Sequence, residues 1–451
     1  MVQPSGKSNG PEVGPYLEKF LRFERLQAQP SWLPPLRKAG MASFAEQGFP
    51  TIHDEDWRFT NVAPLAKLPF RPALEPAADG AVNGSLAGQP FAQVAGPRLV
   101  FVNGRFSTGL SSVGNLQAGV RVESLAAALA GDTGTLEKHL TGYARPEGNA
   151  FAALNQAFFL DGAFIHVPAG VKVETPIQVI FVSAPSQAGD AFHPRNLILA
   201  GDRAKVTIIE SYVGGGGPES VTNAVTELVA GDDAAVELIK FQDEAVNSFH
   251  VATIQGRFGR ASNVNVHSFA LGSRLSRNNI RANLAGEGLE CILNGLYLTK
   301  GEQLADHHMI VEHAQPHCAS HEYFNGILDD KSRGVFHGRI LVRQPAQKTD
   351  AKQTNKNLLL SDDAQADTKP QLEIYADDVK CTHGATIGQL NDESIFYMRS
   401  RGLGTETARR MLIHAFAGEI IDRVRCEPAR EALDRMLWER LESNPHIGET
   451  K

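Results

Sequence analysis

The segment VKCTHGAT places a cysteine and a histidine two residues apart, at Cys381 and His383. Residues two apart on a β-strand point to the same face, and iron accepts both thiolate and imidazole ligands. On spacing alone, a buried cysteine and a hydrogen-bonded strand histidine are the more common arrangement. Two ligands also leave an iron-sulfur cluster incomplete, because four protein ligands usually hold one. If the pair binds iron, we expect a site shared across a subunit interface or a transient, easily released cluster.

A second group of possible ligands lies in HHMIVEHAQPHCASHEYF. It contains His307, His308, His313, His317, Cys318 and His321, and His337 follows. This density suggests a metal site, with His313 and His317 as weaker candidates than the first pair. An unbroken strand would place them on one face, but Pro316 argues that the strand is broken. The favoured alternative is a polar edge near a subunit contact, with the imidazoles hydrogen-bonded to neighbouring groups.

Two further motifs are weaker candidates for a functional site. Paired acids at Asp329-Asp330, Asp362-Asp363 and Asp377-Asp378 could suggest a β-helical carbohydrate-active enzyme. Neighbouring residues on a strand point to opposite faces, so the pairs are more readily explained as turns. The run Gly214–Gly217 is followed by Pro-Glu-Ser and not by Gly-Lys-Ser/Thr. We therefore expect no nucleotide site in this chain.

The elements that position these residues are short Val/Ile/Leu-rich runs between residues 161 and 388. Turns recur at Gly201-Asp202, Gly231-Asp232, Gly259-Arg260 and Gly286-Glu287, with starts 30, 28 and 27 residues apart. The acidic turns at 329 and 362 follow at 43 and 33, so the period is expected to loosen there. A repeat of about 30 residues without helices favours a β-solenoid slightly over a large β-sandwich.

The flanking regions have helical patterns. We expect residues 1–160 to form a mainly helical region with a flexible Ala/Gly/Pro-rich stretch at 71–96. Residues 389–451 should be helical, with Leu412, Phe416, Ile420 and Val424 forming one apolar stripe. These C-terminal helices would either close the open end of the solenoid or dock a partner.

Composition limits the classes of function. The 451 residues include 44 basic and 51 acidic side chains, a formal charge of -7, and no long Lys/Arg block. Nucleic acid and anionic membranes are therefore not expected as partners. Four cysteines without a CxxC pair, together with the lack of an apolar leader or membrane-spanning run, favour a reducing, cytoplasmic location.

Long segments of the chain resemble the SufB/SufD family of iron-sulfur cluster assembly proteins. The most specific is FHGRILVRQPAQKTDAKQTNKNLLLSDDAQADTKPQLEIYADDVKCTHGATIGQL at 336–390, which continues into IFYMRSRGLGTETARRMLIHAFAGEII. FPTIHDEDWRFTN and FAALNQAFFLDGAFIHVPAGVKVETPIQV resemble the family's N-terminal elements. The DEDWRFTN element, and the lack of a cysteine in LLLSDDAQADTKP, are more similar to the SufD branch than to SufB.

The resemblance implies a central right-handed parallel β-helix flanked by helical regions. It also implies a non-catalytic scaffold that acts with SufB and the ABC-type ATPase SufC, which would hydrolyse the ATP. His383 matches a residue implicated in cluster formation with SufB, whereas the role of Cys381 stays open. A transient cluster or iron would then lie at an interface with SufB.

The resemblance further implies that SufC docks on the C-terminal region, for which Arg401, Gly402, His414 and Phe416 are the candidate residues. A homodimer of the isolated chain is a further expectation. The alternatives are a SufB-like, cluster-carrying scaffold and, from another class, a β-helical carbohydrate-active enzyme.

Overall fold

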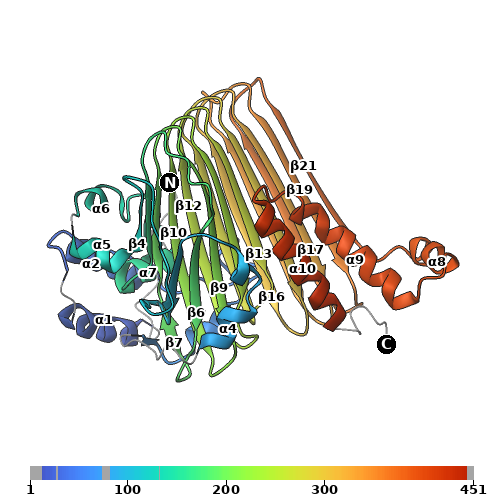
Figure 1. The fold of residues 1–451 in the computed structure, drawn as a ribbon, viewed down its shortest axis with the longest axis horizontal. Coiled ribbons are helices and arrows are strands. Elements are labelled where there is room, and N and C mark those ends of the chain that lie inside the picture. Colours follow the sequence, from blue (N-terminus) through green and yellow to red (C-terminus); the bar gives the residue numbers. More distant parts are fainter. Residues whose placement is uncertain (1–12, 27–28, 74–81, 132, 444–451) are drawn as a thin grey trace.

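The computed structural model describes residues 13–26, 29–73, 82–131 and 133–443. Two long β-sheets face each other across a common interior and form a parallel β-solenoid of about eight turns (Figure 1). Helices of the N-terminal region cover the first coils, and helices of the C-terminal region follow the last strand (Figure 1). The predicted fold class is thereby confirmed.

From β8 onward, successive strands alternate between the two sheets. The ten-stranded sheet contains β2 (Arg98–Val102), β3 (Arg105–Phe106), β6 (Ile177–Ser183), β9 (Lys205–Gly214), β11 (Ala235–Asp243), β13 (Asn263–Ala270), β15 (Glu290–Thr299), β17 (Ala319–Leu328), β19 (Asp350–Leu359) and β21 (Lys380–Gly388). The eleven-stranded sheet contains β1 (Arg71–Pro72), β4 (Arg121–Ser124), β5 (Ala163–Val167), β7 (Asp190–Phe192), β8 (Arg195–Ala200), β10 (Ser220–Ala230), β12 (Phe249–Phe258), β14 (Leu275–Leu284), β16 (Leu304–His313), β18 (Arg333–Val342) and β20 (Gln365–Ile374). Since the long strands all pair in parallel, the structure is not an antiparallel β-sandwich.

The repeat stays regular to the end of the solenoid, so the expected loosening of its period is wrong. Glu290 pairs with Ala319, Ala319 with Asp350 and Asp350 with Lys380, which gives spacings of 29, 31 and 30 residues. The acidic turns at 329 and 362 belong to a different series, because they lead from the ten-stranded sheet back to the eleven-stranded one.

The turns that lead into the ten-stranded sheet have a common construction. A residue in the left-handed region recurs in them, at Arg203, Asp233, Ala261, Gly288, His317 and Lys348. Stacked turns approach closely: a Cβ on Gly231 would lie 2.4 Å from Asp202 Oδ1. The same Oδ1 accepts a hydrogen bond of 2.9 Å from the backbone of Asp232. The recurring Gly-Asp pairs are therefore explained by backbone contact between successive coils.

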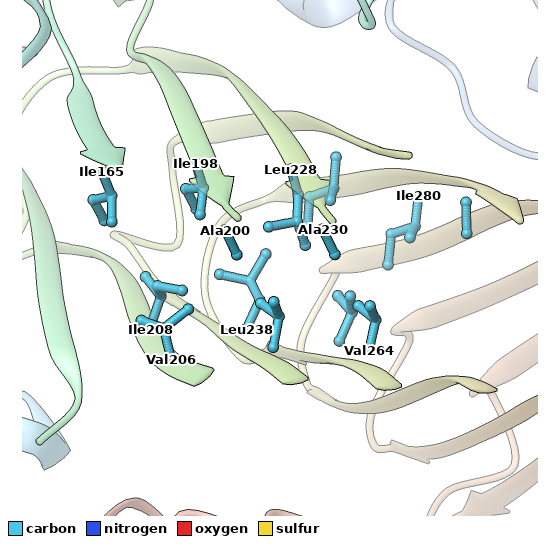
Figure 2. Packing of buried hydrophobic residues seen from close by; sticks show 14 of the residues in the cluster. Ile165, Ile198, Ala200, Val206, Ile208, Leu228, Ala230, Leu238, Val264 and Ile280 are labelled. Carbon is cyan, nitrogen blue, oxygen red and sulfur yellow. The ribbon is translucent and has the colours of Figure 1, made fainter. Parts of the chain in front are cut away.

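Aliphatic side chains from both sheets fill one side of the interior. Ile165, Ile198, Leu228 and Ile280 of the eleven-stranded sheet face Ile208 and Leu238 of the other sheet (Figure 2). Each coil buries its inward side chains against its neighbours, so this core continues from the first coils to β17 and β18.

The N-terminal region contributes strands as well as helices. Its helical elements are α1 (Gly14–Leu26), α2 (Leu33–Gln47), η1 (Glu55–Trp57), α3 (Ala63–Ala66), α4 (Asn83–Gly88), η3 (Pro90–Gln93), α5 (Leu125–Ala130), α6 (Gly134–His139) and α7 (Ala150–Phe158). However, β2 pairs in parallel with β6, and β4 pairs antiparallel with β5. The two sheets therefore begin before residue 161.

The stretch 71–96, predicted to be a flexible connection, is only partly described. Residues 74–81 lie outside the described residues, and the remainder contains β1, α4 and η3. Phe91 of η3 is fully buried and packs edge-on against Phe241 at 5.5 Å. The described part is therefore anchored on the outer face of the ten-stranded sheet.

A buried ion pair fixes the N-terminal region to the solenoid. Arg195 Nη2 lies 3.0 Å from Glu227 Oε2, and both side chains are fully buried. The Glu227 carboxylate also accepts hydrogen bonds of 2.9 Å from the backbone amides of Thr141, Tyr143 and Ala144. These bonds satisfy a charge that would be costly to bury alone.

The C-terminal helices are α8 (Asp392–Ser400), α9 (Thr405–Ile421) and α10 (Glu427–Ser443). α9 and α10 pack on the outer face of the ten-stranded sheet, where Ile413 and Leu433 join a cluster with Phe241 and Phe269 (Figure 1). They do not close the end of the solenoid, so the first of the two expected roles is wrong and the docking of a partner stays a prediction.

The predicted apolar stripe is only partly correct. Ala408, Ile413, Ala417, Ile420 and Ile421 are the buried residues of α9. Leu412 and Phe416 are half-buried, and Val424 is buried beyond the helix end. The helix contacts both the sheet and α10, so its buried face is wider than a single stripe of period four.

Candidate functional site

Cys381 and His383 lie on β21, the last strand of the ten-stranded sheet. Their register partners on β19 are Ala351 and Gln353, whose side chains are buried inside the solenoid. Cys381 is half-buried and packs against an interior cluster that includes Ile340, whereas His383 is exposed. Both residues therefore lie on the inward-facing side of a coil that no further coil covers.

This open end has the features of a surface that a partner covers. β21 pairs only with β19, and β20 only with β18, so each strand has one unpaired edge among the described residues. Ile374, Tyr375 and Ile387 belong to the same coil and are 40%, 61% and 49% exposed. Exposed apolar side chains beside free strand edges typically mark an interaction site.

A polar column leads inward from His383. Gln353, its register partner, donates a 2.8 Å hydrogen bond from Nε2 to Glu322 Oε2 on β17. Burial raises the pKa of Glu322 to about 8, so this carboxyl group holds its proton at neutral pH. Neither Glu322 nor Gln353 was predicted from the sequence, although the alternation in AKQTNKN already places Gln353 on one face with Asn355.

The chemistry available to the pair is metal binding through one sulfur and one nitrogen. Burial raises the pKa of the Cys381 thiol, and Asp350 adds to the effect. The thiol is therefore protonated at neutral pH until a metal ion or a nearby cation stabilises the thiolate. Because the coil is open, further ligands could come from another chain.

The structure separates the two weaker candidates. His313 ends β16 and is buried, with Nε2 2.7 Å from Ser320 Oγ and Nδ1 3.3 Å from Thr349 Oγ1. His317 is exposed and occupies the left-handed position of the following turn, with φ of 60°. The strand break expected from Pro316 is confirmed, and the two imidazoles share no strand face.

The four C-terminal candidates have different environments. Arg401 lies over the Tyr397 ring at 5.2 Å, and Gly402 adopts a left-handed φ of 92° at the turn between α8 and α9. His414 stacks on Trp438 at 4.1 Å and contacts Asp434 at 2.7 Å, while the half-buried Phe416 packs toward the sheet. Arg401 and Gly402 are thus exposed, whereas His414 and Phe416 also take part in packing.

α8 exposes two aromatic side chains that were not among the predicted site residues. Phe396 and Tyr397 are 73% and 59% exposed, and Met411 of α9 is 41% exposed. α8 projects away from the solenoid (Figure 1). Among the described elements, α9 is its main packing partner. The segment IFYMRSRG therefore presents an apolar and basic surface.

The paired acids lie in turns, as expected. The turn after β17 contains Asp329-Asp330, that after β19 contains Asp362-Asp363, and that after β20 contains Asp377-Asp378. All three pairs therefore lie in loops at strand ends, where acidic residues are common turn formers.

Comparison with known families accounts for nearly the whole chain. Residues 181–416 match the SufBD core domain of the SUF system for FeS cluster assembly, and residues 16–179 match the SufBD protein N-terminal region. The chain belongs to the SufBD family. It is an iron-sulfur cluster assembly protein, and the matched SufBD descriptions name no catalytic activity. The SufBD core match extends to residue 416 and so includes α8 and most of α9.

Individual SufBD relatives support this assignment. The chain is 35% identical over 386 residues to an iron-sulfur cluster assembly SufBD family protein of Synechocystis, covering 83% of this chain and 84% of that protein. It is 31% identical over 401 residues to the iron-sulfur cluster assembly protein SufD of Escherichia coli, covering 87% and 90%. Among the described residues of this SufBD protein, no helix is both long and apolar enough to cross a membrane.

Proposed function

We propose that this chain is a non-catalytic, SufD-like scaffold subunit that acts with SufB and the ATPase SufC while a nascent iron-sulfur cluster forms. The observation that carries the proposal is the uncovered last coil, which places Cys381 and His383 on its inward face. Two ligands on an open strand are suited to a cluster or iron that is shared and then released.

SufB is proposed to cover this coil. A β-helical partner could pair its own strands with the free edges of β20 and β21, and bury Ile374, Tyr375 and Ile387. It would then bring its ligands beside His383 and complete the site. The proton on Glu322, two coils inward, keeps the column under His383 neutral.

SufC is proposed to dock on α8 and the start of α9. Phe396 and Tyr397 supply exposed aromatic area, and Arg401 supplies a charged group beside them. Aromatic and arginine side chains are the types that dominate binding energy at protein interfaces. Nucleotide-driven movement of SufC would alter the relation between the two β-helical subunits.

We also propose a cytoplasmic location, supported by four cysteines that form no disulfide. In the absence of SufB, the same open coil could pair with a second copy, giving a homodimer. A SufB-like role, in which this chain alone carries the cluster, is the second candidate; the lack of a cysteine in LLLSDDAQADTKP argues against it.

The test is anaerobic cluster reconstitution on the chain alone and on its complex with SufB and SufC, followed by visible absorption and iron content. We expect little cluster on the chain alone, and His383→Ala should at least halve the yield of the complex without dissociating it. Thr382→Ala is the matched control, because Thr382 is exposed on the same strand and points to the opposite face.

The outcomes separate the candidates. A full, stable cluster on the isolated chain would favour the SufB-like role. An unchanged yield with His383→Ala would remove this residue from the mechanism. Cys381→Ser, measured in parallel, shows whether the thiol contributes.

A further inference from the structure

Asp56, His308 and His337 place one potential ligand atom each within 4.8 Å of one another. His308 on β16 and His337 on β18 are register partners on the outer face of the eleven-stranded sheet. Both side chains are buried, being 3% and 5% exposed. Asp56 reaches them from η1, so the group joins the N-terminal region to the solenoid.

The position of Asp56 is fixed by its neighbours. Arg277 Nη1 donates a 2.9 Å hydrogen bond to the Asp56 carbonyl oxygen, and the guanidinium lies 4.0 Å from the centre of the Trp57 ring. Arg277 is in turn paired with the buried Asp306. On the other side, Lys369 Nζ lies 2.7 Å from Glu55 Oε1. The carboxylate is therefore held over the two imidazoles by contacts that do not involve it.

The three groups have the protonation states that a metal ion requires. Burial lowers the pKa of His308 to about 4 and also lowers that of His337, so both rings are neutral at pH 7. The contact with His308 outweighs the effect of burial and holds the pKa of Asp56 well below its usual range. The site thus offers two neutral imidazoles and one carboxylate.

The ring nitrogens indicate which atoms are available. His337 Nε2 donates to Gln371 Oε1 at 2.8 Å, which leaves Nδ1 with its lone pair. Such a bond from the second ring nitrogen to an oxygen is typical of metal-binding histidines. His308 Nε2 is buried and lies 3.4 Å from Asp56 Oδ1, a contact with poor hydrogen-bond geometry. An ion placed between the imidazole and the carboxylate would satisfy both atoms.

A cavity of about 580 Å³ lies beside the group and is lined by Asp56 and His308 together with Arg277, Arg281 and Arg339. Two of these cations have acidic neighbours, Arg277 in Asp306 and Arg339 in Glu373 at 3.5 Å. Arg281 makes no ion pair among the described residues, and burial lowers its pKa. Arg281 is therefore the group that opposes a bound cation.

We propose that Asp56, His308 and His337 bind one divalent first-row transition-metal ion whose remaining coordination positions face this cavity. Two imidazoles and one carboxylate with open positions suit Fe²⁺ and related ions. The bound ion would tie η1 to β16 and β18 and would exchange ligands through the cavity. This inference does not depend on the proposed role of Cys381 and His383.

The test uses Co²⁺ alone as the probe, added anaerobically to a Cys381→Ser/His383→Ala background so that the last coil does not contribute. Visible d–d absorption and calorimetry should show one ion per chain. Asp56→Asn, His308→Asn and His337→Asn should each weaken the affinity at least about tenfold. His53→Asn is the matched control, because His53 is an exposed histidine three residues from Asp56.

Arg281→Met should change the affinity for Co²⁺ in the opposite direction. Removal of the opposing charge should strengthen Co²⁺ binding several-fold, which a merely structural role of the group would not produce. Asp56→Asn keeps the test valid if a histidine variant unfolds, because the Asp56 side chain is 41% exposed. The proposal is overturned if no ion binds, or if an ion binds with the same affinity in the Asp56→Asn variant.

Discussion

His383 on β21 lies in register with Gln353 on β19, and Gln353 donates a 2.8 Å hydrogen bond to the buried carboxyl group of Glu322. An exposed candidate ligand is thereby connected to a buried titratable group two coils inward. Because Glu322 titrates, the stability of the fold should depend on pH, and unfolding measurements can detect this dependence.

Glu322→Gln should reduce the pH dependence of stability. Below the usual pKa of 4.5 the carboxyl group is protonated in the folded and in the unfolded chain, so it does not change the free energy of unfolding. As the pH rises toward about 8, the unfolded chain ionises while the folded chain keeps the proton, so the wild type loses stability. The loss relative to the variant should reach on the order of 4 kcal/mol near pH 8.

Thermal unfolding midpoints of both proteins at pH 5.5 and pH 8.5 measure this effect. The exposed Glu287→Gln serves as the control and should follow the wild type at both pH values. A difference between Glu322→Gln and the wild type that stays constant with pH would show that Glu322 does not titrate as described.

Charges on the last coil should prevent association with SufB. Tyr375→Asp and Ile387→Asp place a carboxylate on side chains that are 61% and 49% exposed, so the free energy of unfolding should change by less than about 0.5 kcal/mol. Burial of the new charge at an interface would be costly. Analytical ultracentrifugation with SufB should show loss of the complex for both variants. Val246→Asp, on a 66% exposed loop residue, should leave it intact.

The aromatic pair on α8 should control SufC binding. Phe396→Ala with Tyr397→Ala removes most of the exposed apolar area of this helix, and we expect at least about tenfold weaker binding of SufC by calorimetry. Leu21→Ala on α1, 50% exposed, is the control for loss of an exposed apolar side chain. Equal binding by the double variant and the wild type would place the SufC contact elsewhere.

The buried ion pair should be far more sensitive than an exposed one. Arg195→Met leaves the Glu227 charge buried without its partner and should destabilise the fold by about 3–5 kcal/mol. Arg260→Met removes the ion pair between Arg260 and Asp233, two side chains that are 57% and 42% exposed. This change should lower the free energy of unfolding by at most about 1 kcal/mol. Denaturant unfolding, monitored by circular dichroism, compares the two. Similar losses would indicate that the N-terminal region is not anchored through Glu227.

The solenoid was predictable because its signals are local and repeated. A glycine recurs where the backbones of successive coils touch, as Gly231 shows, and an aspartate often follows it. The end of the series was misjudged because the later turns, after β16 and β18, lack the Gly-Asp pair. There the left-handed position is held by His317 and Lys348, which give no turn signal in the sequence.

The three-ligand group could not be predicted from spacing. The alternation of strand residues separates His307 from His308, but it does not say which of them faces outward. Asp56 lies in a distant segment that only tertiary packing brings to β16, through contacts such as that between Arg277 and Trp57. The position of α9 depended in the same way on long-range packing, since its buried face is set by the sheet and α10 together.

The uncovered edge of β20 and β21 also poses a problem of molecular recognition. The hydrogen-bonding groups of a strand edge are the same in every chain, so the backbone does not distinguish a foreign subunit from a second copy. Selection then rests on side chains such as Tyr375 and on the relative concentrations of the competing chains. For this protein, the ratio in which the subunits are synthesised thus becomes part of what determines which complex forms.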